Sequence, residues 1–211
     1  MPKSRKKQRK PKTSGAAGAA LSPHARADTM VRANAALNAG DVVNAERLAK
    51  RVIRGEPSAV DALEVLASVQ FRKGDAKAAA KLLRKAADAA PASPDVNFNL
   101  GVVLFHAGEG DAAIESVKKA LYLDPNYPDG YFEYGGFLNA LGRTEKAAEA
   151  YRESLRRRPD DALALNNLGL ALFDLGDTEG AFANYRAAIK HAPTNPLIRY
   201  NLLDALERRN R

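Results

Sequence analysis

With 211 residues, 45% of them hydrophobic, and no tryptophan, the chain is long enough for one elongated core but too short for two large compact domains. It has no cysteine, which excludes disulfides, thiol catalysis and thiolate metal sites, and nothing indicates an oxidising compartment. The net charge of +8 is concentrated in residues 1–20, which hold seven basic residues and no acid, so the remainder carries only +1.

Residues 1–21 are predicted to form a basic, disordered tail, because a charge run followed by small residues cannot offset the entropy of ordering. The run would suit a nuclear import signal in a eukaryotic source, non-specific phosphate contacts, or a tether to an acidic surface. A solubilising segment without a specific partner is the fourth interpretation. The side chains available for phosphate or acidic-partner contacts are Lys3, Arg5, Lys6, Lys7, Arg9, Lys10 and Lys12.

The sequence shows no membrane or export signal. No window approaches the roughly 18 uninterrupted apolar residues of a membrane span, and the stretch of small residues after the charge run is too weakly apolar for a secretory signal. We therefore expect a cytoplasmic protein without membrane contact, or a nuclear one if the source has a nucleus.

From Ser22 onward the sequence repeats every 34 residues without an insertion, each unit reading as two amphipathic helices, a glycine turn between them and a closing proline. The prolines are Pro57, Pro91, Pro125, Pro159 and Pro193. The turn glycines, placed where the first helix must end in a left-handed residue, are Gly40, Gly74, Gly108, Gly142 and Gly176. A two-helix unit can bury its apolar faces only against its neighbours, which predicts an all-α solenoid.

Within the unit, numbered so that the proline falls at position 32, small residues mark the places where two helix backbones approach. Position 20 is always alanine, and position 8 holds Ala33, Ala67, Gly101, Gly135 and Gly169. Larger side chains at positions 7, 11 and 24 are predicted to fill the core. Helix starts are also marked: Ser22 precedes Pro23, and both Pro94-Asp95 and Pro128-Asp129 place a proline and an acid in a first turn.

This pattern resembles the tetratricopeptide repeat (TPR) family, which implies a right-handed solenoid whose first helices line a concave groove. Five units then span residues 26–59, 60–93, 94–127, 128–161 and 162–195 of a solenoid over 22–211. Residues 196–211 are predicted to form a capping helix, with Asp204, Glu207, Arg208 and Arg209 giving it a polar outer surface.

Position 6 of the inner helices is predicted to form a line along the groove. Along the chain it holds Val31, Val65, Asn99, Glu133, Asn167 and Asn201. These asparagines resemble the inner face of the TPR superhelix of O-GlcNAc transferases, although no catalytic domain is present. An asparagine amide both donates and accepts, so it can pair with a peptide backbone regardless of sequence, whereas Glu133 only accepts. The alternative is that asparagine here simply belongs to the repeat consensus.

Aromatic and acidic side chains share the predicted groove. The aromatic ones are Phe98, Phe105, Phe132, Phe173 and Tyr200. Any one of them could be core, but together they would leave an apolar groove of the kind that marks binding sites. Asp61, Asp95 and Asp129 at position 2 either serve the helix dipole or give the groove negative charge.

No catalytic constellation is found, because the three histidines fall at unrelated repeat positions and every glycine cluster is explained by the repeat. We expect neither enzymatic activity nor a cofactor or metal. Some TPR domains bind acidic peptide C-termini through a carboxylate clamp, and the resemblance implies that such a clamp would need Lys and Arg side chains on the groove-facing positions. Here those positions are mostly apolar, polar or acidic, with Arg72 the main exception before the closing helix. An acidic peptide tail is therefore not the expected ligand.

These observations favour a protein-interaction scaffold that holds an extended, apolar or mildly basic peptide of unknown identity. One alternative is a nucleic-acid-associated protein that uses the tail and a basic ridge at position 25 of the second helices. The ridge consists of Lys50, Arg84, Lys118, Arg152 and Arg186. Another alternative is a homo-oligomer that associates through the groove or the solenoid ends.

Overall fold

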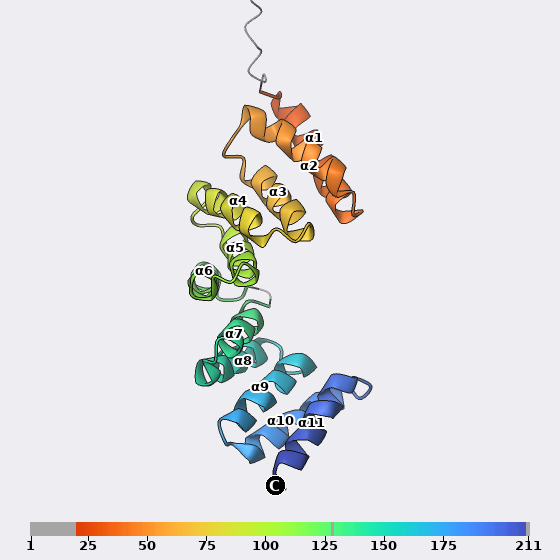
Figure 1. Ribbon diagram of the computed structural model, residues 1–211, viewed down its shortest axis with the longest axis vertical. Helices are drawn as coiled ribbons and strands as arrows, with labels where there is room; N and C mark the ends of the chain where they lie inside the picture. Colours follow the sequence, from red (N-terminus) through yellow and green to blue (C-terminus); the bar gives the residue numbers. More distant parts are fainter. Residues whose placement is uncertain (1–19, 128, 210–211) are drawn as a thin grey trace, which may run out of the picture.

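The computed structural model describes residues 20–127 and 129–209, and in that part of the chain it contains eleven α-helices and no strand. The helices stack one after another along a single long axis, with α1 and α11 at opposite ends (Figure 1). The predicted all-α solenoid is thereby confirmed. None of the described helices is long and apolar enough to cross a membrane.

First and second helices alternate along the chain. The first helices are α1 (Pro23–Asn38), α3 (Val60–Arg72), α5 (Pro94–His106), α7 (Gly130–Ala140) and α9 (Ala162–Asp174). The second helices are α2 (Val42–Gly55), α4 (Ala76–Ala89), α6 (Gly110–Leu123), α8 (Thr144–Arg157) and α10 (Thr178–His191). The last helix, α11 (Pro196–Arg209), has no second helix after it within the described residues.

The turn between the two helices has the same geometry in each unit. All five turn glycines have a positive φ, between 71° and 84°, as the sequence predicts. In three units an aspartate is the N-cap residue of the second helix. The carboxylates of Asp41, Asp75 and Asp177 accept hydrogen bonds from backbone N–H groups three residues on, at 3.0, 2.8 and 3.0 Å.

A close contact between positions 8 and 24 holds the two helices of a unit together. A Cβ atom added to Gly135 would lie 2.7 Å from the Tyr151 ring, and one added to Gly169 would lie 2.9 Å from the Tyr185 ring. Both rings are fully buried, and burial raises the pKa of each tyrosine to about 12. The absent side chain on one helix therefore makes room for a ring from the other.

The start of α7 differs from the prediction. Asp129 is not in the first turn; it is the residue before the helix, with a left-handed φ of 57°, and α7 begins at Gly130. A Cβ on Gly130 would lie 2.7 Å from a Leu121 methyl group, so the helix starts against α6. Aspartate is among the few residues that tolerate the left-handed region, which allows the helix to start late.

The outer face of α11 is less polar than predicted, because three large apolar side chains share it with the exposed Glu207. Leu197, Tyr200 and Leu203 are 53%, 66% and 60% exposed there. Arg208 and Arg209 do not cover this face, since their guanidinium groups lie 4.6 and 4.8 Å from the ring centroids of Phe173 and Phe182. The Arg208 and Arg209 side chains at the end of α11 thus turn towards α9 and α10, and the expected polar outer surface is incomplete.

The contact between positions 8 and 24 can be tested by substitution. Gly135→Ala should lower the free energy of unfolding by about 1–3 kcal/mol, because the added methyl group overlaps the Tyr151 ring. Tyr151→Leu should lower the free energy of unfolding less in the Gly135→Ala variant than in the native chain. In the double variant an alanine faces a leucine, as Ala67 faces Leu83 in the second unit. Urea unfolding followed by circular dichroism measures both effects.

Gly136→Ala is the matched control for this substitution. Its added Cβ would meet only the Tyr151 hydroxyl, at 4.0 Å, so the variant should be at least as stable as the native chain. Equal stability of Gly135→Ala and Gly136→Ala would contradict the proposed packing role.

Candidate functional site

A cavity of about 500 Å³ opens between α5 and α7. It is lined by Asp95, Phe98, Val102, His106, Tyr127, Asp129 and Glu133. Three carboxylates, an imidazole and two aromatic rings therefore surround one hollow. We describe this hollow as the acidic cavity.

Helix α5 supplies one wall of the acidic cavity. Phe98, Val102 and His106 are spaced four residues apart, which puts them on one face of the helix. Tyr127, from the turn that follows α6, packs its ring 4.7 Å from that of Phe98 and donates its hydroxyl to Asp95 at 2.9 Å. Burial and then the Asp95 carboxylate raise the pKa of Tyr127, so its hydroxyl stays a donor.

Helix α7 supplies the opposite wall. Asp129 and Glu133 lie four residues apart, at and just inside the start of the helix. Glu133 is half-buried, and burial followed by the neighbouring Asp129 charge raises the pKa of its carboxyl, although His106 opposes this. A cation placed in the cavity would stabilise the ionised form of this carboxyl.

A second cavity, of about 170 Å³, lies between α3 and α5 and shares Val102 with the first. Glu64, Phe71 and Asn99 line it, and the Asn99 amide donates to the Glu64 carboxylate at 3.2 Å. Burial raises the pKa of Glu64; Asn99 opposes the shift, and Asp95 and Asp61 add to it. Half-buried carboxylates on α3 and α7 thus flank the exposed Asp95 on α5.

The predicted asparagine line is not continuous on the exposed surface. Asn99 is exposed, but Asn201 is only 9% exposed and donates to the Asn166 amide oxygen at 2.9 Å. Asn166 in turn donates to Asn167 at 3.1 Å. In the C-terminal half the amides therefore connect α9 to α11. Position alone did not reveal this, because Asn166 lies one residue before the predicted line.

Most of the predicted groove aromatics contribute to packing. Phe105 stacks on Phe137 at 4.3 Å, Phe132 lies 6.1 Å from Tyr151, and Phe173 lies under Arg208. Tyr200 is exposed at the end of the solenoid. Among the five predicted rings, Phe98 lines the acidic cavity, and the repeat pattern did not identify its partner Tyr127. The available signal was that Tyr127 is the only aromatic residue at position 34 of a unit.

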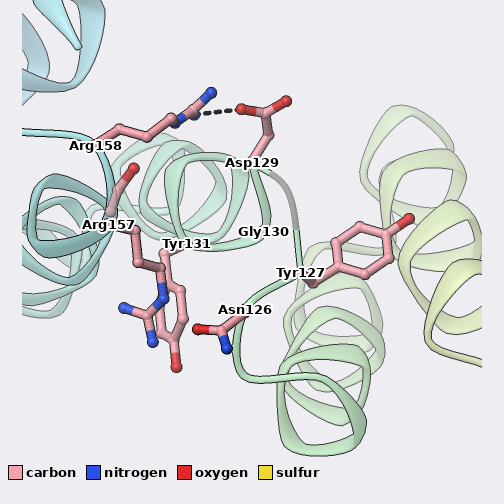
Figure 2. A pocket seen from close by; sticks show the side chains of 8 residues that line it. Asn126, Tyr127, Asp129, Gly130, Tyr131, Arg157 and Arg158 are labelled. Atoms are coloured by element: carbon pink, nitrogen blue, oxygen red, sulfur yellow. Dashed lines mark ion pairs between the residues drawn. The ribbon is translucent and has the colours of Figure 1, made fainter. Parts of the chain in front are cut away.

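Figure 2 shows a smaller cavity, of about 150 Å³, on the other side of the turn that carries Tyr127. Arg158 pairs with Asp129 there, and Arg157 lies over the Tyr131 ring at 4.2 Å, while the Tyr127 ring points away from both arginines (Figure 2). The Arg157 guanidinium also donates to the Pro125 carbonyl at 3.1 Å. These arginines fix the start of α7. Asp129 forms an ion pair with Arg158 and also lines the acidic cavity.

The cations predicted for other roles are partly paired. On the basic ridge, Lys50, Arg84 and Lys118 form ion pairs with Glu46, Glu109 and Glu115. The inner Arg72 donates to the Leu37 carbonyl at the end of α1. The basic residues of the tail lie outside the described residues. Within residues 20–127 and 129–209, no group of His, Asp and Glu is arranged to hold a metal ion.

A model of the tetratricopeptide repeat matches residues 30–94 and 139–196, and a second model of the same repeat matches residues 70–129. The chain belongs to the tetratricopeptide repeat family. The acidic cavity and the cavity next to it therefore lie between first helices of a TPR solenoid. No curated protein matches the sequence.

Solved TPR-like structures share the fold. The chain is similar to the crystal structure of the MamA protein, with 26% identity, a TM-score of 0.72, and coverage of 79% of this chain and 91% of that chain. YrrB, a TPR protein, is 22% identical with a TM-score of 0.72, covering 82% and 89%. PilF of Pseudomonas aeruginosa is 21% identical with a TM-score of 0.74, covering 89% and 86%.

The amide chain of this TPR solenoid predicts different roles for two asparagines. Asn201→Ala should lower the free energy of unfolding by about 1–3 kcal/mol, because the buried Asn166 oxygen loses its donor. Asn99→Ala, on the exposed surface, should change it by no more than about 0.5 kcal/mol. Chemical unfolding of both variants makes the comparison, and equal effects would contradict the structural role of Asn201.

Glu133 predicts a pH-dependent contribution to stability. Its raised pKa means that the folded chain holds the proton more tightly than the unfolded chain, so Glu133 costs stability once the pH exceeds its folded pKa. Glu133→Gln removes this cost. The difference in unfolding free energy, variant minus native, should therefore be larger at pH 7 than near pH 4, about the ordinary glutamate pKa. Urea midpoints at both pH values measure it, with Glu149→Gln on α8 as the outer-surface control.

Proposed function

We propose that this chain is a non-enzymatic protein-interaction scaffold whose concave groove binds an extended peptide with basic and apolar side chains. The observation that carries the proposal is the acidic cavity, where Asp95 and Glu133 stand beside the Phe98 and Tyr127 rings and form no ion pair with a lysine or arginine of the described residues. Such a hollow favours a cation attached to an apolar stem.

Desolvation gives the cavity its preference. The carboxyl groups of Glu64 and Glu133 have raised pKa values chiefly because they are half-buried, so each is stabilised when a cation replaces the lost water. Aromatic faces add to this, because guanidinium and ammonium groups are attracted to the ring quadrupole. Lysine and arginine side chains satisfy both conditions, since their stems pack on apolar surface while their heads meet carboxylates.

The arrangement of the cavities suits an extended ligand. The two hollows share Val102, so they lie next to each other along the axis of the solenoid. In an extended strand, alternate side chains point the same way and stand roughly 7 Å apart, which suits neighbouring hollows. Asn99, exposed between them, can pair with the ligand backbone. YrrB is described as a TPR protein with an unusual peptide-binding site, which agrees with this use of the fold.

A selection from a displayed library of linear peptides against the full chain tests the proposal. We expect enriched sequences to combine Lys or Arg with aliphatic or aromatic residues. The triple variant Asp95→Asn/Asp129→Asn/Glu133→Gln should bind a selected peptide at least about tenfold more weakly, which corresponds to about 1.4 kcal/mol. Fluorescence anisotropy of the labelled peptide measures the affinity.

The matched control changes the net charge equally on the second helices, through Glu115→Gln/Glu145→Gln/Glu149→Gln. This control should keep nearly native affinity. Equal weakening by both triple variants would mean that attraction by overall charge, and not the groove, accounts for binding. Circular dichroism verifies that both variants stay folded.

A further inference from the structure

We propose that the acidic cavity and the neighbouring Glu64 cavity, together called the acidic groove, bind the basic segment of this same chain, residues 3–12, and that peptide ligands compete with it. This inference rests on the proposed function in one respect, because it takes the groove as the surface that binds basic peptides. It adds a specific occupant, which no comparison with a known protein assigns.

The pairing of Arg26 with Asp61 provides the structural template. Arg26 lies in the first turn of α1, and its two terminal nitrogens donate to the two carboxylate oxygens of Asp61 on α3, at 3.0 and 2.8 Å. Its Nε donates to Glu56 at 2.6 Å. A guanidinium from one unit thus pairs with the first-turn acid of the next unit.

The next units repeat the acid, but they have no cation at the place of Arg26. Asp95 and Asp129 follow Asp61 at intervals of 34 residues, while Val60 and Pro94 take the place of Arg26. Asp129 pairs instead with Arg158, from α8 of its own unit. Within the described residues, Glu64, Asp95 and Glu133 form no ion pair with a lysine or arginine, whereas Asp61 on α3 does.

The basic segment enters the fold beside the beginning of this row of acids. Ala20 and Leu21 line a small hollow together with Arg26, Gly55 and Glu56, so the residues before Ala20 start next to the Arg26 pair. Asp95 and Glu133 lie in the first turns of α5 and α7, and Glu64 lies one turn into α3, three residues after Asp61. All three belong to the N-terminal half of a first helix. The segment therefore begins at the acidic edge of the groove.

The segment is long enough to reach the acidic cavity within one molecule. Packed helices lie about 8–10 Å apart, and α1 to α5 pack each on the next, so the α5 wall of the acidic cavity lies at most four such steps, about 40 Å, from α1. Lys6 stands 14 residues before Ala20 and can reach about 46 Å when the chain is extended. Charge matches as well, because residues 3–12 hold seven cations and no acid. Intramolecular binding also benefits from the high effective concentration of a linked ligand.

Zero-length carbodiimide cross-linking of the full chain tests this inference, because it joins lysine amines only to carboxylates in direct contact. We expect cross-links from Lys6, Lys7 or Lys10 to Asp95, Asp129 or Glu133, identified by mass spectrometry of peptides. A mixture of isotopically light and heavy chains shows whether each link joins one molecule or two. The links should disappear near 1 M salt, where the screening length is about 3 Å.

Three results would overturn the inference. Cross-links spread over outer acids such as Glu115, Glu145 and Glu149 would show attraction without a site. Links between light and heavy chains would assign the groove to the segment of a second copy. Links that persist in the groove triple variant at acids elsewhere on the solenoid would show that the groove is not the preferred contact.

A second measurement covers the case in which the groove variant fails to fold. The chain has no cysteine, so Ser4→Cys gives a single site for a nitroxide label. We expect the label to broaden the amide signals of the first turns of α5 and α7 most strongly, and to broaden the first turns of α6 and α8, at the opposite end of the helix pairs, much less. Broadening confined to α1 and α2 would contradict the inference.

The two proposals fail in different ways. If a selected peptide binds the groove while the cross-links fall elsewhere, the segment is not the occupant and the scaffold function stands. If the segment cross-links to the groove and no peptide is selected, the groove serves this chain itself. If both hold, substitution of the seven basic residues by glutamine should leave the groove free and raise the affinity for the selected peptide at low salt.

Discussion

Stacking is the constraint on which this structure depends, because a two-helix unit carries apolar faces that only its neighbours can cover. The largest buried cluster accordingly extends from Ala67 on α3 to Ala205 on α11 and includes residues from every helix between them. The stack is irregular where side chains are unusual, as at the late start of α7. The acidic cavity lies at that irregular place, next to Asp129 and Gly130.

The chemistry of the groove follows from incomplete burial. Side chains of the first helices that are not needed for stacking are left half-covered, and for Glu64 and Glu133 this disfavours the charged form. The Tyr127 hydroxyl donates a hydrogen bond to Asp95 at the rim of the same cavity. The two cavities therefore combine acidic side chains with half-buried ones, which distinguishes them from the charged outer surface.

The features that depend on the repeat itself were predictable from sequence. The left-handed turn glycines, the small residues at position 8 and the large ones at position 24 all follow from the 34-residue period. Features that depend on one unit differing from the others were not. Pro94-Asp95 and Pro128-Asp129 look alike in sequence, yet Gly130 allows α7 to start later against Leu121. Asn201 likewise occupies a groove position but is buried, because Asn166 on the neighbouring helix accepts its hydrogen bond.

The contact between positions 8 and 24 also limits how such a gene can recombine. An exchange at the closing prolines moves whole units, and each unit brings both halves of its own pair, such as Gly135 with Tyr151. An exchange at the turn glycines would join the first helix of one unit to the second helix of another. Ala67 would then meet a tyrosine ring that needs glycine, or Gly135 would face Leu83 across a void. Duplication and shuffling of these units should therefore leave breakpoints near the prolines rather than the glycines.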